Sequence, residues 1–281
     1  MNMPKDARFL VFTDLDGSLL DHHSYSYLDA LPQLHMLEHL GIPVIPATSK
    51  TRQELEHIRA ELGSKEPFIV ENGAAVFIPV GYFAVQPVGT VERAGYWVRE
   101  MSAPRSQWLE ILTALSAQFP EEYEYFFRAG TAGIMRMTNL SEPRAIEANQ
   151  REYSEPVKWL GDDNRKAEFI ACLQARGANV LQGGRFLGVS GDCDKGRALC
   201  WLRDIYLQSA PGVSCHDLAI GDSGNDSAML EAAETALLVR SPVHDFPHLA
   251  RNEGVIRSTD YGPAGWAEGV ARWLHGYQLH K

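Results

Sequence analysis

The chain has 281 residues, of which 45% are hydrophobic and 22% charged, a composition typical of a folded globular protein with one large core or two domains. Its formal net charge of -10, without a basic stripe interleaved with aromatic residues, disfavours nucleic acid as a partner. The apolar run at residues 9–12 is too short for a signal-peptide core or a membrane span. The four cysteines lack the spacing of a zinc site or a disulfide framework. We therefore expect a cytoplasmic protein with no membrane partner.

The first part of the chain alternates short apolar runs with helical patterns. Strands are expected at residues 9–12, 42–45 and 68–70, and helices at 28–40 and 52–62. This βαβαβ order indicates a parallel sheet.

The middle of the chain has a different pattern, and the last third returns to the first one. In the middle we expect strands near 83–85, 123–127 and 133–137, a helix at 104–119, and two further helix–strand units whose helices begin at Ser141 and at Asp162 or Asp163. In the last third we expect helices at 195–207, 227–233 and 264–274 and strands at 218–220 and 236–239. The fold class is therefore α/β: a doubly wound, Rossmann-like parallel-sheet core formed by residues 1–80 and 191–281, with an α+β domain inserted at 81–190.

Two acidic residues, Asp14 and Asp16, follow the first expected strand, with Gly17 beside them. In a doubly wound sheet they lie just past the carboxyl end of a strand, where such folds bind ligands. A carboxylate can attack a phosphoryl group when a divalent cation reduces the charge repulsion, and a second acid can protonate the leaving oxygen. Taken alone, the DxDG pattern is equally compatible with an ordinary acidic turn.

A second acidic motif, GDSGND, follows the strand expected at 218–220 and contributes Asp222 and Asp226. The two motifs would bring four carboxylates to one crevice. Like charges so close repel and raise each other's pKa unless a cation is bound. The sequence therefore predicts a Mg²⁺ site formed by Asp14, Asp16, Asp222 and Asp226.

Thr48 and Ser49 lie between the strand at 42–45 and the helix at 52–62, where a hydroxyl and free backbone N–H groups suit a phosphate oxygen. The alternative is that they simply cap the helix. Lys195 begins a helix, where its charge opposes the helix dipole, which suggests an anion nearby. A solvated surface lysine is the alternative.

Together these four motifs resemble the haloacid dehalogenase (HAD) superfamily in order, spacing and position at strand ends. The motifs are DLDGSLL from Asp14, Thr48, Lys195-Gly196 and GDSGND from Gly221. The resemblance implies these roles: Asp14 as phosphorylated nucleophile, Asp16 as general acid and base, Thr48 and Lys195 as phosphate ligands, and Asp222 with Asp226 as metal support. The insertion between Thr48 and Lys195 implies the subclass with a large α/β cap, where the choice of substrate would reside.

Finer motifs look like the mannosyl-3-phosphoglycerate phosphatase family. They are TSKTRQELE from Thr48, ENGAAVF from Glu71, REYSEP from Arg151, GGRF from Gly183 and GPAGW from Gly262. The candidate substrate-binding residues within them are Glu71, Asn72, Gly73, Arg151, Ser154, Glu155, Gly184 and Arg185. Each motif alone is also compatible with a tight turn, a hairpin or a charged helix end. A glycosyl-phosphoglycerate needs a cation for its carboxylate and hydrogen-bonding groups for its sugar hydroxyls, and Arg185 and Glu155 have that chemistry.

The resemblance implies a Mg²⁺-dependent phosphatase that works through an aspartyl-phosphate and hydrolyses mannosyl-3-phosphoglycerate or a close glycosyl-3-phosphoglycerate, in a compatible-solute pathway. The expected partner is thus a small phosphorylated sugar or glycerate, and the expected state is a monomer or a homodimer. Two alternatives stay open: another sugar-phosphate phosphatase or phosphohexomutase of the same subclass, and an inactive binding module on the same fold.

Overall fold

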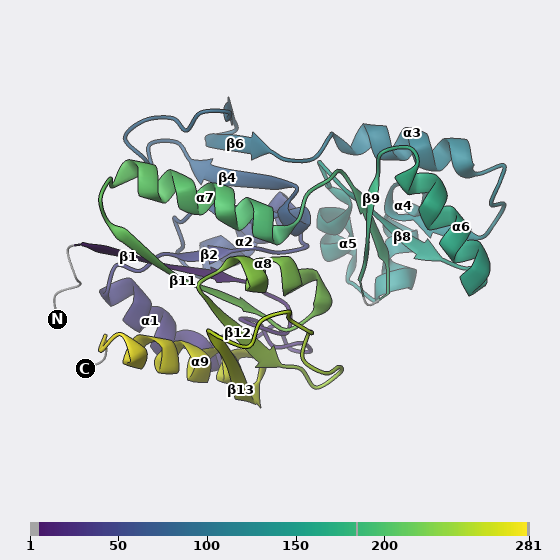
Figure 1. Ribbon diagram of the computed structural model, residues 1–281. Coiled ribbons are helices and arrows are strands. Elements are labelled where there is room, and N and C mark those ends of the chain that lie inside the picture. Colours follow the sequence, from purple (N-terminus) through teal and green to yellow (C-terminus); the bar gives the residue numbers. More distant parts are fainter. Residues whose placement is uncertain (1–5, 184, 280–281) are drawn as a thin grey trace.

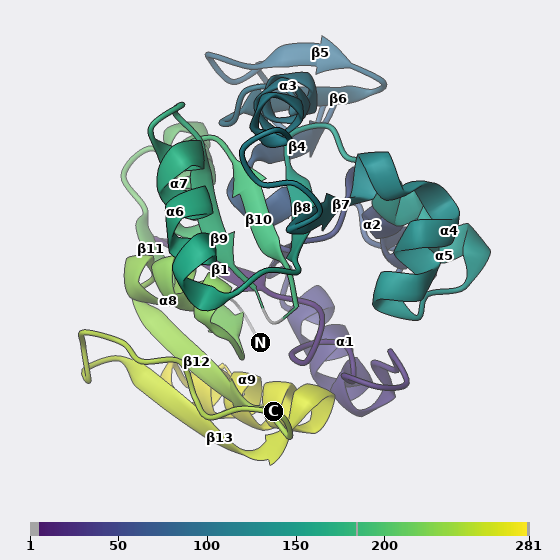
Figure 2. The ribbon, with the colours of Figure 1, turned by 90° about the vertical axis from the view of Figure 1, so that its right-hand side faces the viewer.

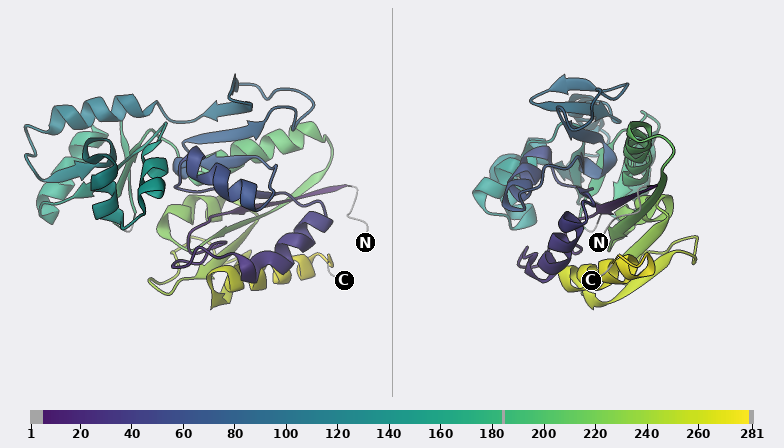
Figure 3. Two further views of the ribbon diagram at one scale, coloured as in Figure 1. Left: turned by 180° about the vertical axis from the view of Figure 1, so that it is seen from behind. Right: turned by 90° about the vertical axis from the view of Figure 1, so that its left-hand side faces the viewer.

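The computed structural model describes residues 6–183 and 185–279. They form a larger core and a smaller cap that lie side by side (Figure 1). Both ends of the described chain belong to the core, on the side away from the cap (Figure 3). Among the described residues, no helix is both long and apolar enough to cross a membrane.

The centre of the core is a five-stranded sheet in which all neighbouring strands are parallel, which confirms the predicted fold class. The strand order is β13-β12-β11-β1-β2. The strands are β1 (Ala7–Thr13), β2 (Val44–Pro46), β11 (Ser214–Gly221), β12 (Thr235–Arg240) and β13 (Val255–Tyr261). Since β1 pairs with β2 on one side and β11 on the other, the chain reverses its winding direction beside β1, where doubly wound sheets bind ligands.

Side chains of β1 alternate between two buried clusters, one on each face of the sheet. Phe9 and Val11 pack with the cluster that contains residues of α1, α2 and α9, whereas Leu10 and Phe12 pack with that of α7 and α8. The helices are α1 (Leu31–His39), α2 (Arg52–Glu61), α7 (Lys195–Ser209), α8 (Ser227–Ala232) and α9 (Gly262–Gly276), with 3-10 turns at Leu28–Ala30, Glu71–Gly73 and Gly224–Asp226. Figure 1 shows α7 and α8 above the sheet and α1 and α9 below it.

An antiparallel sheet of order β3-β4-β6-β5 extends the core beside β2. Its strands are β3 (Phe68–Val70), β4 (Ala75–Pro79), β5 (Val91–Arg93) and β6 (Tyr96–Glu100). The bridge between Ala47 and Ile69 joins it to the end of β2. The domain boundary expected at residue 81 stays a prediction. We propose that the cap starts after Glu100, because β6 pairs along its whole length with β4 of the core.

The cap is a second antiparallel sheet, of order β7-β8-β10-β9, with its own helices. Its strands are β7 (Tyr123–Tyr125), β8 (Glu155–Trp159), β9 (Asn179–Gln182) and β10 (Leu187–Ser190), and its helices are α3 (Arg105–Leu115), α4 (Phe126–Thr138), α5 (Glu142–Asn149) and α6 (Asp163–Gln174). Trp108 of α3 and Phe169 of α6 pack with Val157 of β8 in a separate apolar cluster. Seen from the cap end, α4 and α5 lie on the other side of this sheet from α6 (Figure 2).

Two of the expected strands are wrong. Residues 133–137 belong to the part of α4 that follows a kink at Gly130, and Ile134 packs there with Ala145 and Ala148 of α5. Residues 83–85 form a bend, in which the buried ring of Phe83 packs edge-on against Tyr206 of α7. Side-chain packing, and not strand pairing, holds this segment.

The two connections between core and cap meet at Ser102 and Gly191. The backbone N–H of Gly191 donates to Ser102 Oγ at 2.8 Å, and Ser102 Oγ also lies within 3.1 Å of the carbonyl oxygen of Tyr153. A methyl group at Gly191 would lie 3.2 Å from Cα of Ser102, so the two crossing segments are in close contact.

Candidate active site

The two acidic motifs meet at the carboxyl ends of β1 and β11, as predicted from the parallel order. The backbone N–H of Asp14 donates to the carbonyl of Ile220 at 2.8 Å, which continues the pairing of the two strands up to the first carboxylate. Thr13, the last residue of β1, is held from the other side, since the indole N–H of the buried Trp266 donates to its Oγ1 at 2.9 Å. The GPAGW motif at the start of α9 thus supports the residue next to Asp14.

Three buried carboxylates, those of Asp14, Asp222 and Asp226, form one cluster, with one oxygen of each within 4.8 Å of the others. Lys195, at the start of α7, is fully buried among them. Its ammonium lies 2.6 Å from Oδ1 of Asp14 and 2.7 Å from Oδ1 of Asp226. Lys195 is therefore part of the cluster, and the alternative of a solvated surface lysine is wrong. Three carboxylates and one ammonium leave excess negative charge when all are ionised.

The pKa values of the cluster reflect this excess of negative charge. Burial, with the nearby charge of Asp226, raises the pKa of Asp14 well above its ordinary value despite the opposing effect of Lys195. Burial and Asp226 likewise raise the pKa of Asp222 to about 6. Burial alone would lower the pKa of Lys195, but the charges of Asp14 and Asp226 outweigh it and raise that pKa. The buried carboxylate oxygens of Asp14, Asp222 and Asp226 fit a hard divalent cation, which would remove the repulsion.

Asp16, the fourth predicted metal ligand, has its carboxylate outside this three-residue cluster. Its Oδ2 pairs with the ammonium of Lys50 at 2.6 Å, whereas its buried Oδ1 has no hydrogen-bond partner among the described residues. Sequence reasoning missed Lys50, although it lies two residues after Thr48. Burial acts to lower the pKa of Lys50, but the charges of Asp16 and Glu54 raise it overall.

Gly17 lets the acidic loop fold back against Asp222. It has a φ of +80°, and a methyl group there would lie 2.5 Å from Oδ2 of Asp222. Its N–H donates to the carbonyl of Leu20 at 2.8 Å, closing a short loop. A residue with a side chain at this position would meet both backbone strain and a steric clash with the cluster.

Thr48 is buried in the loop between β2 and α2 and does not cap the helix. The N-cap is Thr51, whose side chain accepts from the N–H of Glu54 in a capping box. Oγ1 of Thr48 accepts from the N–H of Lys50 at 3.1 Å, and the carbonyl of Thr48 accepts from the N–H of Asn72 at 2.9 Å. The capping alternative is therefore wrong for Thr48 and Ser49.

Glu71, Asn72 and Gly73 lie together after β3 with left-handed backbone angles, φ being 49°, 59° and 91°. The side-chain oxygen of Asn72 accepts from the amide of Asn225 at 3.1 Å, which joins this turn to the GDSGND loop. Gly73 lies so close to the carbonyl of Asp194 that no side chain would fit. The turn therefore links the loops that carry Thr48, Lys195 and Asp226.

Glu71 is buried at the contact between core and cap. Its carboxylate accepts from the N–H of Glu152 at 2.8 Å, the N–H of Tyr153 at 3.2 Å and the hydroxyl of Ser154 at 2.6 Å. Arg151 lies 3.6 Å from this carboxylate and donates to Ser154 Oγ at 3.0 Å and to the carbonyl of Ser49 at 2.8 Å. Glu71, Arg151 and Ser154 thus form one network that joins the cap to the loop of Ser49.

The remaining candidates in the cap lie apart from this network. Glu155 is fully buried, where it pairs with Arg105 at 2.5 Å and accepts from the N–H of Phe127 at 2.8 Å. Arg185 is exposed on the hairpin between β9 and β10, 3.3 Å from the carbonyl of Thr138. Gly184 lies outside the described residues.

Comparison with known proteins agrees with this geometry. Residues 11–82 match the family model described as haloacid dehalogenase-like hydrolase. A glucosyl-3-phosphoglycerate/mannosyl-3-phosphoglycerate phosphatase of Methanococcoides burtonii is 36% identical, covering 94% of this chain and 96% of the relative. A protein of the same name from Persephonella marina is 32% identical, covering 95% and 97%.

Solved structures share the fold at low sequence identity. The sucrose-phosphatase of Synechocystis sp. PCC6803 superposes with a TM-score of 0.58 at 14% identity, covering 96% of this chain and 98% of the other. A sugar phosphatase of HAD subclass IIB gives a TM-score of 0.61 at 13% identity, covering 96% and 99%. By its near full-length similarity to the two relatives, the chain belongs to the glucosyl-3-phosphoglycerate/mannosyl-3-phosphoglycerate phosphatase family of the haloacid dehalogenase-like hydrolases.

Proposed function

We propose that this enzyme hydrolyses the phosphate ester of a glycosyl-3-phosphoglycerate, with mannosyl-3-phosphoglycerate as the first candidate, and requires Mg²⁺. The observation that carries the proposal is the buried cluster of Asp14, Asp222 and Asp226 around Lys195, in a chain 36% identical to a phosphatase named for this substrate class. Bound at these carboxylates, Mg²⁺ would lower the charge repulsion between them and an incoming phosphate.

Asp14 is the nucleophile in this proposal. Lys195 holds Oδ1 of Asp14 at 2.6 Å, which fixes the carboxylate and leaves Oδ2 to attack phosphorus. The P–O bond to glycerate breaks as the bond to Asp14 forms, giving an aspartyl-phosphate. Water then attacks that phosphorus, which releases inorganic phosphate and restores Asp14.

Asp16 is proposed to donate the proton to the leaving glycerate oxygen and to take one from the attacking water. Its buried Oδ1, without a partner among the described residues, is available for this, while Lys50 holds Oδ2 at 2.6 Å. Lys50 therefore orients Asp16.

Thr48, Ser49 and Lys195 are proposed to bind the phosphate oxygens. Thr48 Oγ1 accepts one hydrogen bond and donates none among the described residues, so its proton is available to a ligand. The network of Arg151, Ser154 and Glu71 holds the carbonyl of Ser49 against the cap, so the cap helps to position the loop that carries the phosphate site.

Substrate selection is proposed to reside in the cap. Arg185 is exposed and is therefore available for the carboxylate, as the sequence suggested. Glu155, paired with Arg105, is proposed to act by holding β8 and α3 together. The cytoplasmic location and the monomeric or dimeric state stay predictions.

The test is release of inorganic phosphate from mannosyl-3-phosphoglycerate, glucosyl-3-phosphoglycerate, simple sugar phosphates and p-nitrophenyl phosphate. We expect the glycosyl-phosphoglycerates to have the highest kcat/KM, and Asp14→Asn to abolish turnover of all substrates without changing the melting temperature by more than a few degrees. Preference for a simple sugar phosphate would overturn the substrate assignment. Transfer of phosphate to another sugar position, without release, would indicate a phosphohexomutase, and no Mg²⁺-dependent turnover at all would indicate a binding module.

A further inference from the structure

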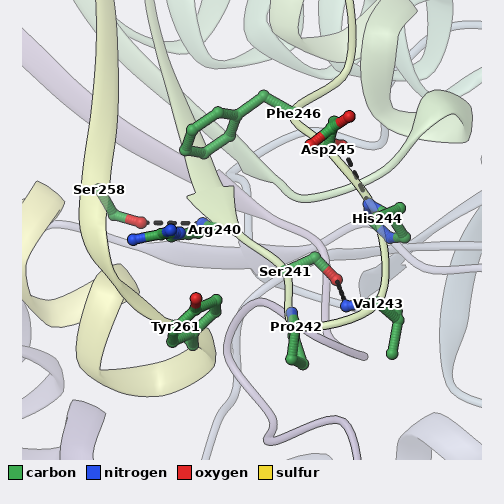
Figure 4. Close-up of a pocket in the computed structure, with 9 residues that line it drawn as sticks. All are labelled: Arg240, Ser241, Pro242, Val243, His244, Asp245, Phe246, Ser258 and Tyr261. Atoms are coloured by element: carbon green, nitrogen blue, oxygen red, sulfur yellow. Dashed lines mark hydrogen bonds between the residues drawn. The ribbon is translucent and has the colours of Figure 1, made fainter.

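A pocket of about 480 Å³ lies past the carboxyl ends of β12 and β13 (Figure 4). Because both strands run parallel to β11, these ends lie at the same edge of the sheet as Asp222. The lining residues are Arg240, Ser241, Pro242, Val243, His244, Asp245, Phe246, Ser258 and Tyr261.

The pocket adjoins both catalytic loops. His244, in its wall, has Nε2 3.4 Å from Oδ2 of Asp222. Gly262 follows Tyr261 at the opposite wall, and a methyl group there would lie 4.0 Å from the carbonyl oxygen of Gly17. A ligand bound at the acidic cluster would therefore have this pocket next to it.

Arg240 is the only lysine or arginine among the lining residues. It forms no ion pair with any carboxylate of the described residues, and its guanidinium has one long hydrogen bond, of 3.4 Å, to the carbonyl of Thr259. Asp245 also lines the pocket but forms no ion pair with Arg240. In a chain with a net charge of -10, an arginine without a carboxylate partner beside a phosphatase centre is a candidate site for an anion.

The position of Arg240 is nevertheless well defined. Its backbone N–H donates to Ser258 Oγ at 2.8 Å, and its guanidinium lies 4.8 Å from the centre of the Tyr261 ring. Stacking on an aromatic ring leaves the edge of a guanidinium free to bind a carboxylate through two parallel hydrogen bonds.

We propose that this pocket is the subsite for the glycerate part of the substrate, with Arg240 binding its carboxylate. The inference rests on the proposed function: a phosphoglycerate carries two anionic groups, and once the phosphate lies at the acidic cluster, the carboxylate needs a second cation close by. Hydroxyls of Ser241 and Tyr261 are available in the lining for the remaining oxygens. Arg185, in the cap, is the competing partner for the same carboxylate.

The experiment compares mannosyl-3-phosphoglycerate with its carboxyl methyl ester, which keeps the phosphate and the sugar but lacks the negative charge. The measured quantity is the ratio of kcat/KM for the acid to that for the ester. Wild type is expected to favour the acid, and Arg240→Met to reduce the ratio by roughly tenfold to a hundredfold, mainly through KM. Arg257→Met, a change of the same type at an exposed position of β13, is the matched control and should keep the wild-type ratio.

Arg240→Lys distinguishes loss of the positive charge from damage to the fold. Because lysine keeps the charge, this variant should prefer the acid over the ester more strongly than Arg240→Met does. If Arg240→Met has the same ratio as wild type, the subsite is overturned. If Arg185→Met instead loses the preference for the acid over the ester, the carboxylate is bound by the cap. In both cases the wild-type enzyme still hydrolyses the glycosyl-phosphoglycerate, so the proposed function survives. If wild type hydrolyses sugar phosphates but no glycosyl-phosphoglycerate, the proposed function and the subsite both fail.

Discussion

Gly17→Ala should damage catalysis far more than it damages the fold, because its added methyl group meets a carboxylate of the acidic cluster. At a φ of +80° an alanine is strained, and its Cβ would lie 2.5 Å from Oδ2 of Asp222. Gly41→Ala is a matched control: Gly41 has a φ of +65°, and a methyl group there would have no neighbour within 4 Å. The two variants share the backbone strain and differ in the clash.

The left-handed conformation costs an alanine about 1 to 2 kcal/mol, so both variants should lose that much of the free energy of unfolding. Only Gly17→Ala must also displace Asp222, and movement of a catalytic group by about 1 Å costs on the order of a hundredfold in rate. We therefore expect kcat/KM for p-nitrophenyl phosphate to fall about a hundredfold in Gly17→Ala, with a higher Mg²⁺ concentration needed for half-maximal activity.

The free energies of unfolding come from urea denaturation, and the kinetics from a Mg²⁺ titration at fixed substrate. Gly41→Ala should match Gly17→Ala in stability within about 1 kcal/mol and match wild type in Mg²⁺ dependence. If the two variants have the same kcat/KM and the same Mg²⁺ dependence, contact between Gly17 and Asp222 does not control the metal site, and the reasoning is refuted.

Three further predictions concern the cluster and the cap. Excess EDTA should abolish activity and added Mg²⁺ restore it; full activity in EDTA would contradict the metal site. Glu71→Ala should lower the free energy of unfolding by about 3 kcal/mol or more in urea denaturation, since two buried donors and one part-buried donor lose their acceptor. The exposed Glu92→Ala should have little effect. Burial and the charge of Asp226 raise the pKa of Asp222 from its ordinary value of 3.8 to about 6 in the folded protein. In chelator, the contribution of Asp222 to stability is therefore full below pH 3.8 and is lost as the pH rises through 6. The loss from Asp222 should reach up to about 3 kcal/mol. Asp222→Asn should therefore reduce the pH slope of stability in urea denaturation at pH 4 to 8, while the part that comes from Asp14 remains.

The candidate catalytic centre was the most predictable part of the molecule, because Asp14 and Asp222 each follow a short apolar run that forms a parallel strand. Parallel strands bring their carboxyl ends to one edge, so strand order alone brings the two motifs together. Lys195 was predictable for a related reason: a lysine at a helix start is unfavourable unless anions surround it.

The sequence contained no comparable signal for the contacts between distant segments. Lys50 and His244 are ordinary polar residues in loops, and Arg240 is the last residue of a strand. Only the folded chain shows that they lie near Asp16 and Asp222 or line a pocket. The apolar residues at 133–137 suggested a strand, but methionine and isoleucine suit a helix equally well when a second helix covers it. Tertiary packing decided that case.

The hydrogen bond between Ser102 and Gly191 has a consequence for how such enzymes diversify. Because the inserted segment leaves and re-enters the core at one point, its two ends are already neighbours, and a short turn is enough to join residue 102 to residue 191 without it. Insertions with adjacent ends are the ones that folded proteins tolerate best. Gain or exchange of this segment therefore leaves the strand ends that carry Asp14 and Asp222 unchanged. The same hydrolytic centre can then acquire a new substrate specificity without changes to its own residues.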